Sequence, residues 1–156
     1  ASETRTYDSL YFLKEIEWEN TCSGPAAPPL KKTIEYTEDS LKSAEIIISS
    51  GINKERIDYN YNEEKQVNQI IYSNWIPDLY NWKAASRDTF EYNNFGLVIN
   101  KINQKRSDAD TSWNNNRSIF YLYNSNLKLI HETEKAWLPK KKCWISIFRR
   151  AYKWGE

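Results

Sequence analysis

A repeat of 31 residues constrains the fold of this sequence more strongly than any other feature. Tyr-Asn pairs and single tryptophans recur at this interval between residues 57 and 154. The recurring residues are Tyr61-Asn62, Tyr92-Asn93 and Tyr123-Asn124, together with Trp82, Trp113 and Trp144, and a new copy begins at Tyr152-Lys153-Trp154. Sequence periods of about 20–50 residues are typical of proteins built from stacked structural repeats.

The composition of one copy favours strands over helices. Aromatic and β-branched residues suit a half-buried strand, whereas Asn clusters interrupt helices and favour turns. Alternation in the middle copy predicts one face that carries Trp113, Asn115, Arg117, Ile119, Tyr121 and Tyr123. We therefore predict an all-β fold, with strands at 82–92, 97–106, 113–123 and 128–137.

Short links between these strands require antiparallel hairpins. About five hairpin copies would form a curved or spiral sheet. The length of 156 residues predicts a single β-repeat domain over 1–156. Within it, 1–56 holds two degenerate repeats with a Pro-rich connection at 21–30, and 57–156 holds three regular repeats and the start of a sixth.

The tryptophans allow a structural and a ligand-binding interpretation. Strict periodicity favours a structural ladder in which aromatic residues pack one repeat on the next. We assign Trp82, Trp113, Trp144, Tyr61, Tyr92 and Tyr123 to this ladder. Trp75 and Trp137 lie beside turns and are missing from the middle copy. They are therefore the better candidates for stacking on the rings of a glycan.

The charge of the chain is divided between its two parts. Up to residue 64 there are 13 acidic and 7 basic side chains, and from residue 65 onward there are 8 acidic and 15 basic. This asymmetry indicates a partner with an acidic face, or else an ordinary solvated surface. The candidate partner contacts are Lys140, Lys141, Lys142, Tyr152 and Trp154. The net charge of +1 disfavours nucleic acid binding, and no apolar run has the length of a membrane span.

Candidate catalytic and metal-binding patterns are weak. His131 is the single histidine, and no nucleophile motif accompanies it. Asp108 and Asp110 lie in one turn, and their carboxylate oxygens are candidate calcium ligands. Their spacing, however, is not that of a known calcium loop. Cys22 and Cys143 can form a disulfide or remain separate thiols. We expect no enzymatic activity, no metal and no cofactor.

One segment carries a resemblance to a known family. Phe90-Glu91-Tyr92-Asn93-Asn94-Phe95-Gly96-Leu97-Val98 resembles the tyrosine–aspartate (YD, Rhs-type) repeat, in the divergent form of secreted Bacteroidetes proteins. The similarity covers 57–156 well and the first third loosely, and Asn replaces the usual Asp in three copies. It implies a β-hairpin spiral or shell on a secreted or surface protein. Asp-Ser-Leu at Ser9 and at Ser40 also resembles the O-glycosylation signal of that group.

These observations predict a secreted or cell-surface module without enzymatic activity. The N-terminal Ala1-Ser2-Glu3 suits the product of signal-peptide cleavage. We expect the module to bind a protein within a larger extracellular or outer-membrane assembly. One alternative is a carbohydrate-binding module that uses exposed Trp and Tyr. Another is a shell segment of an Rhs-type toxin-delivery protein.

Overall fold

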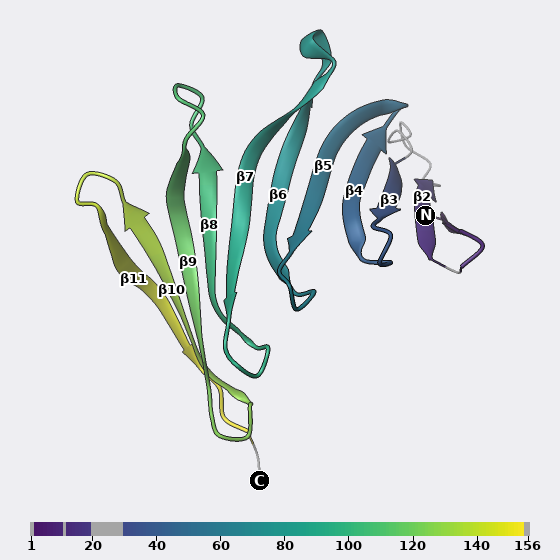
Figure 1. Cartoon of the computed structure of the whole chain (residues 1–156). Coiled ribbons are helices and arrows are strands. Elements are labelled where there is room, and N and C mark those ends of the chain that lie inside the picture. The colour runs from purple at the N-terminus through teal and green to yellow at the C-terminus, as the bar shows by residue number, and fades with distance from the viewer. Residues whose placement is uncertain (1, 11, 20–29, 155–156) are drawn as a thin grey trace. The chain divides into compact units, whose positions relative to one another are not determined.

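The computed structural model describes residues 2–10, 12–19 and 30–154, which form strands joined by short turns (Figure 1). One short 3-10 helix, η1 (Pro77–Leu79), interrupts the described strands. The strands are β1 (Ser2–Tyr7), β2 (Leu13–Glu19), β3 (Leu30–Tyr36), β4 (Lys42–Ser49), β5 (Ile52–Tyr61), β6 (Val67–Ile76), β7 (Asn81–Tyr92), β8 (Val98–Arg106), β9 (Trp113–Tyr123), β10 (Leu129–Leu138) and β11 (Cys143–Ala151).

The strands follow one another in the sheet in the order of the sequence, from β1 to β11. Their described pairings are antiparallel, so the predicted all-β class is confirmed. The four predicted strands correspond to β7, β8, β9 and β10, and each boundary lies within one residue of its prediction. The Pro-rich connection expected at 21–30 lies, up to residue 29, outside the described residues.

The chain divides into two compact units. One comprises Ala1–Asn60 and Ile71–Ala85, and the other comprises Tyr61–Ile70 and Ser86–Glu156. The described residues of the first unit include two buried apolar side chains, Ile34 and Ala44, at neighbouring positions of β3 and β4. Most strand residues are half-buried instead. Cross-strand side-chain pairs must therefore supply much of the packing energy.

The turns that follow β1, β3, β5, β7 and β9 begin with Asp, Thr or Asn, and the contacts explain this choice. Asn93 Oδ1 accepts hydrogen bonds from the backbone N–H groups of Phe95 (2.9 Å) and Leu97 (3.0 Å). A short polar side chain can thereby satisfy turn donors that the strands leave unpaired. The same kind of contact is made by the side chains of Asp8, Thr37, Asn62 and Asn124.

The fourth position of these turns is left-handed in every described case. Ser40, Lys65, Gly96 and Leu127 have φ angles of +63°, +59°, +76° and +59°. Residues other than glycine thus adopt this conformation here, so φ alone does not require Gly96. A Cβ at Gly96 would lie 2.9 Å from Gln66 Nε2, and this close approach to the neighbouring turn distinguishes the glycine from its counterparts.

Replacing Asn93 with Ala should lower the free energy of unfolding by about 1 kcal/mol, because two backbone donors lose their acceptor. Chemical denaturation of the chain measures the change. The matched control is Asn94→Ala in the same turn, because Asn94 is exposed. We expect its effect to stay below about 0.5 kcal/mol. Equal losses in the two variants would contradict the role of the Asn93 side chain.

A register shift divides several strands and corrects one prediction. In β9, Asn115 pairs with Gln104 and Arg117 pairs with Asn103, so Asn116 is an extra residue. Such a bulge reverses which alternate residues face a given side of the sheet. Trp113 therefore lies on one face, while Ile119, Tyr121 and Tyr123 lie on the other. The prediction that residues 113–123 share one face by simple alternation is wrong.

The position of this extra residue recurs along the chain. Pairing of β4 with β5 skips Lys54, and pairing of β10 with β11 skips Ile147. Lys54, Asn116 and Ile147 are separated by two periods and by one period of the 31-residue repeat. In β11 the shift also places Trp144 on the face opposite to Phe148 and Arg150. The bulge thus separates the Trp end of a strand from its Tyr end.

Candidate partner-binding surface

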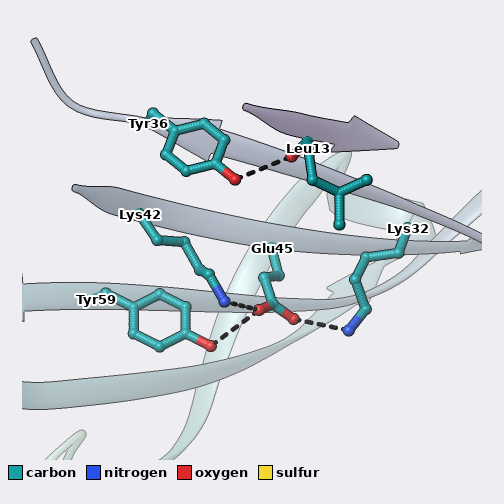
Figure 2. Close-up of polar contacts among 6 residues, drawn as sticks. All are labelled: Leu13, Lys32, Tyr36, Lys42, Glu45 and Tyr59. Carbon is teal, nitrogen blue, oxygen red and sulfur yellow. Dashed lines mark hydrogen bonds and ion pairs between the residues drawn. The ribbon is translucent and has the colours of Figure 1, made fainter. Parts of the chain in front are cut away.

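Two tyrosines of the predicted ladder, Tyr92 and Tyr123, and the further tyrosine Tyr36 form a recurrent contact between hairpins. Tyr36, Tyr92 and Tyr123 each donate a side-chain hydrogen bond to the first residue of an earlier strand, at the carbonyls of Leu13 (2.9 Å), Val67 (2.7 Å) and Val98 (2.9 Å). Figure 2 shows the contact of Tyr36. Burial raises the pKa of Tyr92 and of Tyr123, so both hydroxyls stay protonated donors. Tyr61 ends β5 and is half-buried.

Each tryptophan of the predicted ladder packs against the residue on the other side of the turn that precedes its own strand. Trp82 contacts Trp75, and Trp144 contacts Trp137, each in an edge-to-face pair with 5.1 Å between ring centroids. Trp75 and Trp137 are half-buried by these contacts. Their rings are therefore less available as sugar platforms than their places beside turns suggest.

The middle copy replaces this aromatic pair with a cation–π contact. Arg106 occupies the place of Trp75 and Trp137, and its guanidinium lies 5.5 Å from the Trp113 ring centroid. Arg87 lies over the same ring at 4.6 Å. Because the guanidinium also packs flat on aromatic faces, Arg can substitute for Trp at this position. The 31-residue interval places Arg106 at this position in the sequence, but the contact of Arg106 with Trp113 was not predicted.

Two buried carboxylates that sequence reasoning missed hold ion-pair clusters, one in each unit. Glu45, 7% exposed, contacts Lys42 Nζ (2.6 Å), Lys32 Nζ (3.0 Å) and the Tyr59 hydroxyl (3.2 Å), as Figure 2 shows. Burial by itself would raise the pKa of Glu45, but the hydrogen bonds from the two lysines lower it overall.

In the other unit, Asp88 is equally enclosed. It pairs with Lys101 Nζ (2.8 Å) and accepts a hydrogen bond from Asn103 Nδ2 (2.8 Å). These groups line a hollow of about 260 Å³ together with Arg117 and Glu134, which pair with each other at 2.8 Å. Because lysines of the same or the neighbouring strand neutralise Glu45 and Asp88, we interpret the two clusters as structural cross-strand contacts.

The last strand, β11, presents the most exposed apolar surface among the described strands. Its described pairing is with β10 along one edge. Ile145, Ile147 and Phe148 are 40%, 48% and 44% exposed. Arg149 and Arg150 follow them directly and are exposed too. We define β11 and the preceding turn 139–142 as the candidate partner-binding surface.

The turn before β11 brings the predicted basic residues together. Lys140, Lys141 and Lys142 are exposed, and Lys142 adopts a left-handed φ of +49°. Pro139, Lys140 and Lys141 join Leu138 around an open apolar hollow of about 440 Å³. The stems of the lysines thus supply apolar surface, while their ammonium groups keep the turn basic.

Tyr152 and Trp154 were predicted to contact a partner, and the side chain of each also makes a hydrogen bond within the chain. The Tyr152 hydroxyl donates to Glu132 Oε2 (3.0 Å), and Trp154 Nε1 donates to the Leu129 carbonyl (2.7 Å). Leu129 begins β10, so Trp154 makes the contact that tyrosines make in the earlier hairpins. Trp154 nevertheless remains 53% exposed.

Arg150 completes this region by stacking between two rings. Its guanidinium lies 5.2 Å from the Phe148 centroid and 6.0 Å from that of Tyr152. A hydrogen bond to the Tyr152 hydroxyl raises the pKa of Arg150. The alternation Phe-x-Arg-x-Tyr at 148–152 is the sequence signal that could have identified this stack.

Ser9, Ser40 and Asp110 lie outside this surface, whereas Cys143 is the first residue of β11 and belongs to it. Ser9 and Ser40 are exposed in turns, as their assignment to glycosylation requires. Cys143 is an exposed free thiol, and Cys22 lies outside the described residues. Asp110 binds Ser112 through its carboxylate, and hydrogen bonds from Ser112 and Ser107 lower the pKa of Asp110.

The described part of the chain lacks both a metal-binding cluster and a helix that could cross a membrane. No group of three or more His, Cys, Asp or Glu side chains is placed to hold a metal ion there. In the same residues, no helix has both the length and the apolar character that a membrane crossing needs.

Comparison with known proteins relates the chain to solved structures and to no named family. No protein-family model matches it, and no curated protein matches it. A protein of unknown function from Bacteroides fragilis NCTC 9343 is similar in fold, with a TM-score of 0.55, 11% identity and coverage of 89% of this chain and 92% of that chain. A DUF3836 family protein from Bacteroides vulgatus ATCC 8482 has a TM-score of 0.51 and 19% identity, covering 62% of this chain and 98% of that chain. Both neighbours come from Bacteroidetes, the group that the repeat resemblance suggested.

Proposed function

We propose that this chain is a secreted or cell-surface β-repeat module without enzymatic activity that binds a protein partner within a larger assembly. The single observation that carries the proposal is the exposed strand β11, with Ile145, Ile147 and Phe148 open to solvent beside two arginines. A strand with one paired edge presents a row of free backbone donors and acceptors to another strand.

The repeat character of the module is part of the proposal. The tyrosine contact at Val67 and Val98, and the bulges at Asn116 and Ile147, both recur at the 31-residue interval. These recurrences support an array of hairpins of the divergent YD type. Such arrays are joined by nearest-neighbour contacts, so an added hairpin or strand continues the same packing.

The charge of β11 and its turn selects the kind of partner. Between Lys135 and Gly155 the sequence has seven basic residues and no acidic one. Like charge and the bulge at Ile147 oppose pairing of β11 with another copy of itself. A partner strand with acidic side chains would instead gain both backbone pairing and electrostatic attraction.

Photo-cross-linking in cells that produce the protein tests this proposal. With a benzophenone amino acid at Ile147, we expect a discrete covalent adduct to a second protein, because this side chain lies on the exposed edge strand. The control position is Phe95, which is 71% exposed in a turn away from β11. Replacing Arg149 and Arg150 with Glu should abolish the adduct.

Two results would contradict the proposed interface. Failure of position 147 to form an adduct would show that β11 is not covered in the cell. Equal adducts from positions 147 and 95 would indicate non-specific contact.

A further inference from the structure

A polar cleft lies between two neighbouring turns of the second compact unit, away from β11. It has a volume of about 500 Å³, and the turns at 62–66 and 93–96 form two of its sides. Asn68, Phe90 and Tyr92 complete the lining. Its volume falls in the range of about 300–1,000 Å³ that small-molecule sites occupy, but most of its lining is polar.

Carboxamides dominate the polar groups of this cleft. Asn68 and Asn94 are exposed, and Gln66 is held by a hydrogen bond from Asn62 Nδ2 to its Oε1 at 3.1 Å. That bond leaves Gln66 Nε2 directed toward Gly96, where a Cβ would lie 2.9 Å away. A carboxamide both donates and accepts hydrogen bonds, as the hydroxyl groups of a sugar do.

Two aromatic rings on one strand face give the cleft an apolar component. Phe90 and Tyr92 are two residues apart in β7. The register shift between Glu91 and Tyr92 skips Ile99 of β8, so β7 itself has no extra residue there and its side chains alternate. The Tyr92 ring is fixed by its hydrogen bond to the Val67 carbonyl (2.7 Å). A fixed ring costs little entropy when a ligand packs against it.

The charge of the cleft restricts its ligand. Among the described residues that line it, Glu64 is the one acidic or basic side chain, and it is exposed in its turn. An anionic ligand would meet this carboxylate without a compensating cation in the lining. A neutral ligand would instead find an additional hydrogen-bond acceptor for its hydroxyl groups.

We propose that this cleft between the turns at 62–66 and 93–96 binds a neutral carbohydrate. Asn68, Asn94 and Gln66 contact the hydroxyl groups, and the Tyr92 ring packs against the apolar face of a sugar ring. This site is separate from the tryptophans at 75 and 137, and it does not depend on the protein-binding role of β11.

Side-chain amide NMR signals of the ¹⁵N-labelled chain test the assignment directly. The probes are cellotetraose and mannotetraose, with tetragalacturonate as the anionic comparison, each up to about 10 mM, well above a weak Kd of about 1 mM. A neutral probe should shift the NH₂ signals of Gln66, Asn68 and Asn94. The Asn68→Ala, Asn94→Ala double variant should raise the Kd by about tenfold or more, which equals about 1.4 kcal/mol.

The control variant is Asn114→Ala, which removes an exposed carboxamide from β9 outside the cleft. We expect it to leave the Kd unchanged, and backbone spectra should show that all variants stay folded. The proposal is overturned if neither neutral probe shifts the cleft amides, if the shifts centre on Trp75 or Trp137 instead, or if tetragalacturonate is the better ligand.

Discussion

Replacing Tyr123 with Ala should lower the free energy of unfolding by about 2–4 kcal/mol. The half-buried ring is lost, and the Val98 carbonyl loses the hydrogen bond that the hydroxyl donates at 2.9 Å. Tyr123 ends β9 and Val98 begins β8, so the contact ties one hairpin to the hairpin before it. Chemical denaturation monitored by tryptophan fluorescence measures the loss.

Two further variants separate the ring from the hydroxyl. Tyr123→Phe keeps the packing and removes one hydrogen bond, so we expect a loss of about 1 kcal/mol. Tyr80→Ala is the exposed control, because Tyr80 is 85% exposed beside η1, and its effect should stay below about 0.5 kcal/mol. If Tyr123→Ala were as mild as Tyr80→Ala, the inter-hairpin contact would not stabilise the fold.

The strands and turns could be predicted from the sequence because their signals are local. Asn at the start of a turn and alternating aromatic residues in a strand act through neighbours a few positions away. The contacts of Asn93 and the bounds of β7 and β9 follow from such signals. The recurrence of Tyr-Asn is also explained, since Tyr contacts the preceding hairpin and Asn closes the turn.

The face of each side chain could not be predicted, because one extra residue in the middle of a strand reverses it. Asn116 and Ile147 share no side-chain chemistry, so the bulge leaves no residue-type signal at its position. Its cause lies in the pairing with the neighbouring strand rather than in local propensity. The predicted ladder therefore divides into a Trp set and a Tyr set on opposite faces in β9.

Only part of the candidate surface could be predicted, because some of its features are local in the sequence and others depend on contacts between strands. Charge and turn composition are visible in the sequence, and Lys140 to Lys142 are exposed as expected. The Trp75–Trp82 and Trp137–Trp144 pairs depend on which residues meet across a turn, seven positions apart. Exposure of Ile145 and Ile147 depends on the absence of a described neighbour on one side of β11, which residue identity does not encode.

Glu45 should make the stability of the chain depend on pH in the acidic range. Its pKa is lowered in the folded chain, where the hydrogen bonds from Lys42 and Lys32 outweigh the opposing effect of burial. In the unfolded chain a Glu titrates near its ordinary value of about 4.3. A lowered folded pKa adds stability that is present above this value and is lost as pH falls through the folded pKa.

Substitution of Glu45 with Gln should therefore cost about 2–3 kcal/mol at pH 7, because two lysine ammonium groups lose their buried partner. Lys32 and Lys42 are 27% and 37% exposed, so water can reach them and limits the loss. The difference between the two proteins should shrink as pH falls from about 4.3 through the folded pKa, since the Glu45 carboxylate is protonated first in the unfolded chain and then in the folded one. Denaturation curves at pH 7, 5 and 3 measure this convergence.

The control is Glu38→Gln, which neutralises an exposed carboxylate in the turn after β3. Its effect should stay below about 0.5 kcal/mol at each pH at which the chain is folded. A Glu45→Gln loss that stayed constant from pH 7 to pH 3 would show that shape, rather than charge, explains the cost. Because Glu45 pairs across the strands with the buried Ile34, such a result would assign the site to packing alone.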